Sequence, residues 1–149
     1  MSHRTNLIYV LADGAHARFV QRSRETGDFT TVQELDGSGR LAALRAEQRD
    51  EGPGRAFESA TSARHGVGRE DVYRRAKAEF AARVAEALGA FLEKREVEGV
   101  VLAAPPRLLH DLRKRLPSGV RIVAELGKDL VKTPDHELGA WLVLAVRLT

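Results

Sequence analysis

Two groups of basic residues in this chain stand beside features that suit anion binding, a glycine-rich stretch and the start of a helix-like segment. They are Arg55, Arg64 and Arg69 in the first group, and Arg107, Arg113 and Lys114 in the second. A guanidinium can bind a phosphate through two hydrogen bonds, and glycines let the backbone approach an anion closely. The structural alternative is that Arg55 pairs with Asp50 or Glu58 and only holds its own segment in place.

A catalytic site is harder to find. A two-metal nuclease needs carboxylates on the central strands, but the apolar run 100–104 is followed by proline, and Asp13 falls in a turn. The histidines lack the close spacing of metal ligands, and no Gly-x-Ser-x-Gly elbow is present. The glycines at 66 and 68 lack the Lys-Ser/Thr that would complete a phosphate loop. We therefore expect neither catalysis, nor a metal, nor a cofactor.

Length and composition indicate one domain spanning residues 1–149. The chain has no cysteine, which excludes disulfides and thiolate chemistry. Its longest apolar run, 140–146, is far short of the about 20 residues that cross a bilayer, and the first residues do not resemble a signal peptide. We expect a cytoplasmic protein that does not insert into a membrane.

Charge is unevenly distributed along the chain. Residues 105–121 carry five basic residues and one acidic residue, whereas residues 25–39 carry four acidic residues and no basic one. A protein polarised in this way can dock an anionic partner on its basic segment. The alternative is that both segments are ordinary solvated surfaces.

The elements that must position these residues include a strand–helix–strand unit. Residues 100–104 form an apolar run that ends at Pro105 and Pro106, and leucines then recur at helical spacing to residue 116. A second apolar run follows at 122–126. A unit of this kind predicts two parallel neighbouring strands joined by a right-handed crossover.

The first 36 residues predict an antiparallel meander of three strands. An apolar run at 7–11 is followed by Asp13-Gly14, a hairpin signal because glycine accepts the positive φ of tight turns. A second strand at 15–20 and a polar strand at 29–35 follow, and the polar strand suits a sheet edge.

The next segment, 37–69, is rich in glycine and arginine and predicts a long surface loop, with room for a short helix around 41–48. From Glu70 the apolar spacing predicts an amphipathic helix of about 25 residues. Thr133-Pro134 predicts the cap of a last helix, with Leu138, Trp141, Leu142 and Ala145 on its core face. This helix is apolar on its other sides too, so it is either buried within the fold or part of a homodimer contact.

Together these elements predict an α/β fold with a ribonuclease H-like mixed five-stranded sheet. The expected strand order is 3-2-1-4-5, in which the first three strands form the antiparallel meander and the last two are parallel. Helices are expected on both faces of the sheet, because the central strands are apolar without alternation.

Three motifs in this order resemble the bacterial family described as proteins required for attachment to host cells. They are VLADGAHARFV at 10–20, GPGRAFES at 52–59, and VLAAPPRLLHDLRKRL at 101–116 followed by VAELGKDL. The motif residues are Asp13, Gly14, Pro53, Gly54, Pro105, Pro106, Lys128 and Asp129. The resemblance implies a role of the host-attachment type. Because no catalytic motif is present and the basic residues cluster as described above, we expect a non-catalytic binding module that acts through the arginine-bearing loop and the basic helix on a partner still to be identified.

That family is also similar, at the level of fold, to the central domain of archaeal and eukaryotic peptide-chain release factors. In those proteins a Gly-Gly-Gln loop precedes a long helix, whereas residues 65–69 here read His-Gly-Val-Gly-Arg without glutamine. A second hypothesis is therefore an RNA- or ribosome-associated domain that lacks the hydrolysis motif. A third is a hydrolase acting on RNA or peptidyl-tRNA.

Overall fold

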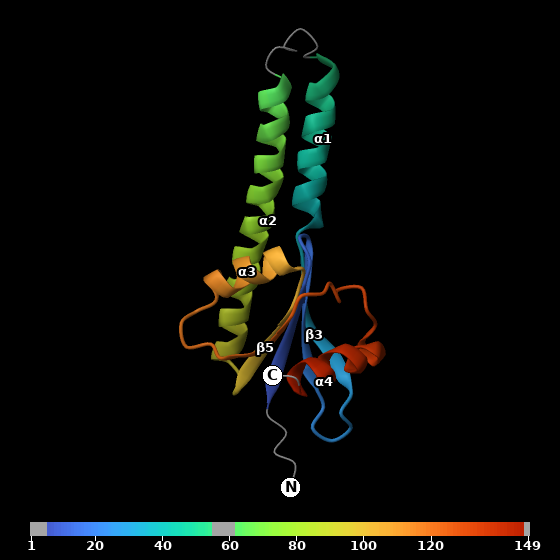
Figure 1. The fold of residues 1–149 in the computed structure, drawn as a ribbon, viewed down its shortest axis with the longest axis vertical. Helices are drawn as coiled ribbons and strands as arrows, with labels where there is room; N and C mark the ends of the chain where they lie inside the picture. Colours follow the sequence, from blue (N-terminus) through green and yellow to red (C-terminus); the bar gives the residue numbers. More distant parts are fainter. Residues whose placement is uncertain (1–5, 55–61, 148–149) are drawn as a thin grey trace.

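A computed structural model describes the backbone of residues 6–54 and 62–147, and the side chains of residues 6–47 and 71–147. Its elements, in chain order, are β1 (Leu7–Ala12), β2 (His16–Arg22), β3 (Phe29–Asp36), α1 (Ser38–Gly54), α2 (Ser62–Glu93), β4 (Gly99–Ala103), α3 (Pro106–Arg115), β5 (Ile122–Leu126), the 3-10 helix η2 (Asp135–Glu137) and α4 (Gly139–Arg147). The strands form one sheet in the order β3-β2-β1-β4-β5 (Figure 1). β1, β4 and β5 are parallel, and β2 is antiparallel to both its neighbours. The predicted fold class and strand order are confirmed.

Strand β1 is the centre of the sheet, and all six of its residues are buried. One face packs against α2 and α3, through a core that includes Ile8, Val10, Phe19, Phe80, Val84, Leu88, Leu109 and Leu112. The other face packs against η2, α4 and the segment before them, through Leu7, Tyr9, Leu11, Leu130, Leu138 and Leu142. The expected helices on both faces are therefore present, because a central strand that is apolar on both sides needs two covers.

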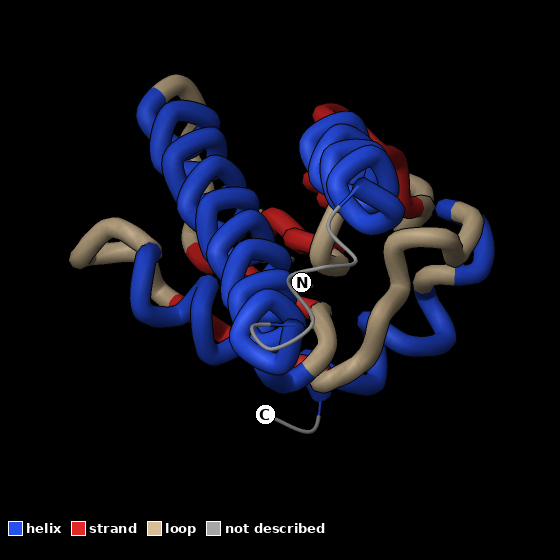
Figure 2. The backbone as a smooth tube through the Cα atoms, turned by 90° about the horizontal axis from the view of Figure 1, so that it is seen from above, coloured by secondary structure: helices blue, strands red, loops and turns tan. Residues whose placement is uncertain are grey.

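The predicted long loop at 37–69 is wrong, because most of this segment is helical. α1 has 17 residues and α2 has 32, and the second helix is about 48 Å long at about 1.5 Å per residue. The two form a hairpin that projects beyond the sheet, and from above the strands lie beneath it (Figures 1 and 2). The stretch LAALRAEQ at 41–48 consists of strong helix formers, which outweigh the flanking glycines, and Leu44 is buried.

The hairpin leaves the sheet at a tightly packed junction. A Cβ on Gly37 would lie 2.5 Å from Cδ1 of Phe80, so this position requires glycine. The next residue, Ser38, donates hydrogen bonds from its hydroxyl and its N–H to Asp36, and these bonds lower the pKa of the Asp36 carboxyl. The carboxylate thereby satisfies a free N–H group at the start of α1.

The last helix differs from its prediction at its start and on one face. Pro134, not Thr133, precedes η2, no side chain caps it, and the α-helix begins only at Gly139. Leu138 and Leu142 are buried as predicted, but Trp141 is 40% exposed. Its ring lies 3.7 Å from Nζ of Lys128, a cation–π contact that holds the indole at the surface.

One buried charge links β2 and β3 to η2. Arg18 donates to Thr31 Oγ1 at 3.1 Å and to Asp135 Oδ1 at 2.7 Å. It also donates to the carbonyl oxygens of Leu130 and Thr133. Asp135, in the first turn of η2, therefore lies opposite this guanidinium.

No helix in the described part of the chain is both long and apolar enough to cross a membrane.

Candidate functional site

A cavity of about 430 Å³ lies at the carboxyl ends of β1 and β4. It is lined by the β1–β2 turn, by α2 and by the start of α3, through Gly14, Tyr73, Arg74, Lys77, Pro105, Arg107, Leu108 and Asp111. From this edge β1 leads to β2 on one side, and β4 leads through α3 to β5 on the other. Open α/β sheets bind ligands where connections diverge in this way, so this cavity is the candidate site.

The two helices present their polar residues to the cavity because their apolar faces are held by the core. On α2, Tyr73 and Lys77 are four residues apart and lie on one face. On α3, Arg107 and Asp111 have the same spacing. Ala76 and Phe80 are buried on the neighbouring face of α2, as are Leu108, Leu109 and Leu112 on α3. The core thus fixes the orientation of both polar faces.

The β1–β2 turn forms the edge of the cavity beside α2. Asp13 Oδ1 accepts the N–H of Ala15 at 2.8 Å and the N–H of His16 at 2.6 Å, which closes the predicted hairpin. Gly14 does not have a positive φ, so the expected reason for glycine is wrong. A Cβ here would lie 3.2 Å from Cε of Lys77. Glycine instead lets the Lys77 side chain lie across the turn.

The cavity is positively charged. Arg74, Lys77 and Arg107 are exposed, and among the described side chains none of them forms an ion pair. Asp111 is the one carboxylate in the lining. Arg107 also lies in the first turn of α3, which has no acidic residue, so its charge is close to the positive end of the helix dipole. Three cations in this arrangement repel one another until an anion binds.

The other residues of the predicted basic helix do not reach the cavity. Arg113 forms a bidentate pair with Glu125, with Nε to Oε1 at 2.8 Å and Nη2 to Oε2 at 2.7 Å, and these hydrogen bonds raise the pKa of Arg113. Lys114 is exposed in the last turn of α3. Arg107 is therefore the predicted anion-binding residue on α3 that the structure brings to the cavity.

The predicted residues of the first basic group lie in the helical hairpin or beyond the described residues. Arg64 and Arg69 belong to α2, where the structure describes only their backbone. Pro53 and Gly54 end α1. Arg55 lies outside the described residues.

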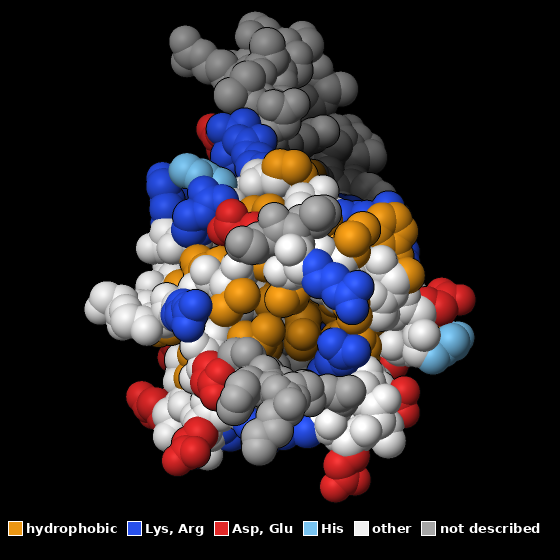
Figure 3. Space-filling view, turned by 60° about the horizontal axis from the view of Figure 1, so that its bottom comes forward, with side chains coloured by type: hydrophobic (Ala, Val, Ile, Leu, Met, Phe, Trp, Pro, Cys, Tyr) orange, Lys and Arg blue, Asp and Glu red, His pale blue; other side chains and the backbone are white. Residues whose placement is uncertain are grey.

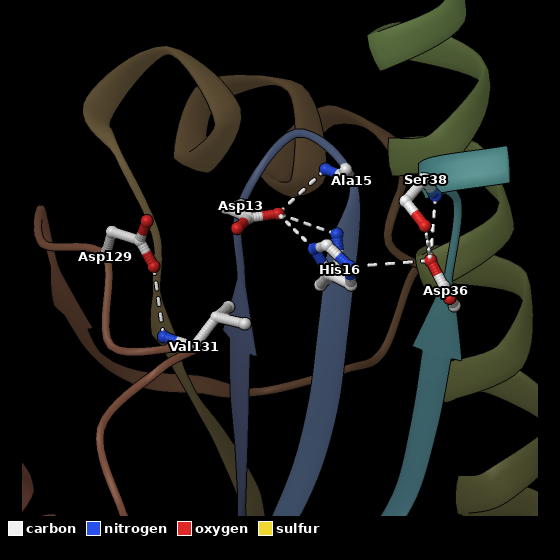
Figure 4. A network of polar contacts seen from close by, with 7 residues as sticks. All are labelled: Asp13, Ala15, His16, Asp36, Ser38, Asp129 and Val131. Atoms are coloured by element: carbon white, nitrogen blue, oxygen red, sulfur yellow. Dashed lines mark hydrogen bonds and ion pairs between the residues drawn. The ribbon is translucent and has the colours of Figure 1, made fainter. Parts of the chain in front are cut away.

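The carboxylates around this end of the sheet shape turns (Figure 4). Asp13 closes the first hairpin, Asp36 binds Ser38, and Asp129 Oδ1 accepts the N–H of Val131 at 3.0 Å. His16 lies between two of them, with Nδ1 3.6 Å from Asp13 Oδ1 and Nε2 3.5 Å from Asp36 Oδ1. Within the described residues, no group of three or more such side chains could hold a metal ion.

The proline and lysine residues of the family motifs also have structural roles. Pro105 precedes the first turn of α3, and its carbonyl accepts the N–H of Leu109 at 3.0 Å. Pro106 occupies the first helical position, where a missing N–H costs nothing. Lys128 contacts Trp141, as described above. Because neither proline has an N–H, side chains must provide most of the positive charge at this cavity.

A second cavity, of about 210 Å³, lies at the opposite end of the sheet beside α4. Hydrophobic side chains gather at that end next to Lys and Arg side chains (Figure 3). Burial raises the pKa of Tyr9 there, against the opposing effect of the Arg22 charge. This cavity borders the amino end of β1, which is not the end where open α/β sheets bind ligands.

Tyr73, Arg74 and Lys77 were not among the site residues predicted from the sequence. Their helical spacing could have indicated a shared polar face, since positions 73, 74 and 77 lie on one side of the apolar stripe of α2. The packing of α2 against α3, however, decides that this side lies across the cavity from Arg107.

The fold and the cavity place the chain among mixed-sheet α/β proteins with a ligand-type crevice at the carboxyl ends of their parallel strands. The chain belongs to the family described as "Protein required for attachment to host cells", whose sequence model matches residues 8–142. The match runs from β1 into α4, so it includes the whole cavity. No curated protein matches the chain.

Proposed function

We propose that this protein is a non-catalytic binding module in host attachment, and that it engages an anionic partner through the basic cavity and the adjoining faces of α2 and α3. The observation that carries the proposal is the convergence of Arg74, Lys77 and Arg107 on one cavity that has a single carboxylate. Attachment to host cells is the role named for the family. A surface that concentrates positive charge attracts an anionic partner and speeds its association.

The lining of the cavity supports binding more than catalysis. It contains no serine, threonine, cysteine or histidine, so the pairing of a hydroxyl or thiol nucleophile with a histidine base is not found among these residues. His16, at the neighbouring turn, lies between Asp13 and Asp36.

The release-factor hypothesis rests on similarity of fold alone, because residues 65–69 lack the glutamine of the hydrolysis motif. Residues 65–69 lie inside α2, so they do not form a loop before the long helix. RNA remains one kind of anionic partner, and the titration with a ribonucleotide hexamer described below tests it.

A homodimer through α4 stays a prediction. Leu144 is 55% exposed and Trp141 is 40% exposed on this helix, whereas Val143 and Val146 pack partly against the core. Leu144→Lys therefore tests the contact without disturbing the core, and Val143→Lys does not. A dimer predicts a lower sedimentation mass for Leu144→Lys than for the wild type, and equal masses contradict it.

The experiment for attachment compares bacteria that lack the protein with bacteria complemented by the wild type or by a triple variant. The variant carries Arg74→Glu, Lys77→Glu and Arg107→Glu, and a control carries Arg121→Glu, an exposed change at the opposite end of the sheet. We expect fewer attached cells without the protein, restoration by the wild type and the control, and no restoration by the triple variant. Full restoration by an equally abundant triple variant contradicts the proposed surface.

A further inference from the structure

We propose that the cavity between α2, α3 and the β1–β2 turn binds a free nucleotide, a ligand with a phosphate group and an aromatic body. This inference rests on the proposed function, because it names the ligand class of the same site. Three features of the cavity support it, namely its charge, its apolar surfaces and its size.

The first feature is a cationic group suited to phosphate. Arg74 and Lys77 come from α2 and Arg107 comes from α3, so a phosphate between the helices meets cations from both sides. An arginine binds phosphate through two parallel hydrogen bonds, and a lysine acts as a point charge. Arg107 lies near the positive end of the α3 dipole and shares the cavity with two other cations, so its charge lowers the stability of the fold when no ligand is bound. A bound dianion would neutralise this repulsion.

The second feature is the apolar and aromatic surface beside this charge. Tyr73, Pro105 and Leu108 line the same cavity, and the methylenes of Lys77 lie over Gly14. Leu108 is 7% exposed and belongs to the core, so this wall is rigid. Inorganic phosphate would leave these surfaces unused, whereas a base can lie against them. Asp111 can accept a hydrogen bond from a hydroxyl or amino group of the same ligand.

The third feature is size and position. A volume of about 430 Å³ falls within the range of about 300–1,000 Å³ that is typical of small-molecule sites. The cavity also lies at the carboxyl ends of two parallel strands, where the connections diverge, as in nucleotide-binding α/β sheets. A free nucleotide therefore matches the charge, the surface and the volume together.

Calorimetric titration of the full chain tests the proposal with ADP, AMP, adenosine, inorganic phosphate and a ribonucleotide hexamer as probes. We expect ADP to bind, and adenosine and phosphate each to bind about tenfold more weakly or worse, because each lacks half of the contacts. Arg107→Glu and Lys77→Glu should each weaken ADP binding by about tenfold or more. Arg121→Glu, with the same charge change at the other end of the sheet, should leave it within about twofold.

Several outcomes would overturn the proposal. They are no binding of ADP or AMP at about 1 mM, phosphate binding as tightly as ADP, and equal effects of Arg107→Glu and Arg121→Glu. Binding of the hexamer without binding of either mononucleotide would also overturn it, because the cavity would then be part of an RNA surface. Each variant is checked for folding by its circular dichroism and unfolding midpoint before it is titrated.

The attachment experiment separates this inference from the proposed function. If ADP does not bind but the triple variant still fails to restore attachment, the nucleotide proposal fails and the binding surface stands. If ADP binds and the triple variant restores attachment fully, the cavity is a nucleotide site and the attachment surface lies elsewhere.

Discussion

Arg18 and Arg107 show two opposite uses of the same side chain. Arg18 is 8% exposed and donates to a hydroxyl, a carboxylate and two carbonyl oxygens. Arg107 is exposed, forms no ion pair among the described side chains, and shares its cavity with two further cations. The first arginine joins β2 and β3 to η2, whereas we propose that the second binds an anionic partner.

The number of polar partners, and not the residue type, separates Arg18, which is structural, from Arg107, which we propose as a binding residue. Burying a guanidinium without hydrogen-bond partners costs too much free energy for a folded protein to keep. Arg18 has partners for its two terminal nitrogens, and its Nε atom is buried without a hydrogen bond in the described part of the chain. An exposed cluster of cations costs much less, because water screens the charges. The cavity can therefore keep a local repulsion that a core could not.

The largest effect that we predict follows the loss of Arg18. Arg18→Met keeps much of the volume but removes the guanidinium donor from the carbonyls of Leu130 and Thr133, and it leaves Asp135 with its hydrogen bonds from Thr31 alone. We expect the free energy of unfolding to fall by about 2–3 kcal/mol, as measured by urea denaturation. The matched control is Arg113→Met, which breaks an exposed, solvent-screened pair with Glu125 and should leave the free energy of unfolding nearly unchanged. Equal decreases in the free energy of unfolding for the two variants would contradict the distinction between a buried structural arginine and an exposed one.

A smaller effect is expected from acid, through Asp135. Burial raises the pKa of Asp135, but hydrogen bonds from Thr31 and the charge of Arg18 outweigh it, so the pKa is lowered overall. A lowered pKa means that the stabilisation by this carboxylate is complete above the unfolded value of about 3.9, and is lost as the pH falls through the folded value. Unfolding free energies of wild type and Asp135→Asn should therefore converge below about pH 4. Curves that stay parallel between pH 6 and pH 2 would contradict this assignment.

The smallest effect should have the opposite sign. Arg107→Glu removes a cation from the first turn of α3 and from the neighbourhood of Arg74 and Lys77, and places an anion near the positive helix end. We expect the unfolding free energy to rise by about 0.3–1 kcal/mol, measured without ligand and at low salt. Arg115→Glu, at the other end of the same helix, should lower it by a similar amount. A destabilised Arg107→Glu would indicate that this arginine has a structural role after all.

Much of the fold could be predicted from local pattern. The apolar run at β1 and β4, the polar edge strand β3, and the strand–helix–strand unit around α3 all follow from hydrophobic periodicity, and the sheet order follows from standard connections. The hairpin of α1 and α2 did not follow, because the glycines near both ends of α1 suggested a loop. Its helical propensity lies in a short alanine- and leucine-rich stretch, and its stability depends on contact with α2.

The candidate site was predicted only in part, for a physical reason. Sequence alone determined that Arg107 follows a buried strand at the start of a helix, and that Asp13 and Gly14 form a turn. Only the tertiary structure decided that Tyr73, Arg74 and Lys77, more than 25 residues away from Arg107, lie opposite it. It also decided that Arg113 is paired and that Arg18 is buried with Asp135. Periodicity records which face of an element is apolar, whereas the partner of each polar residue depends on how separate elements pack together.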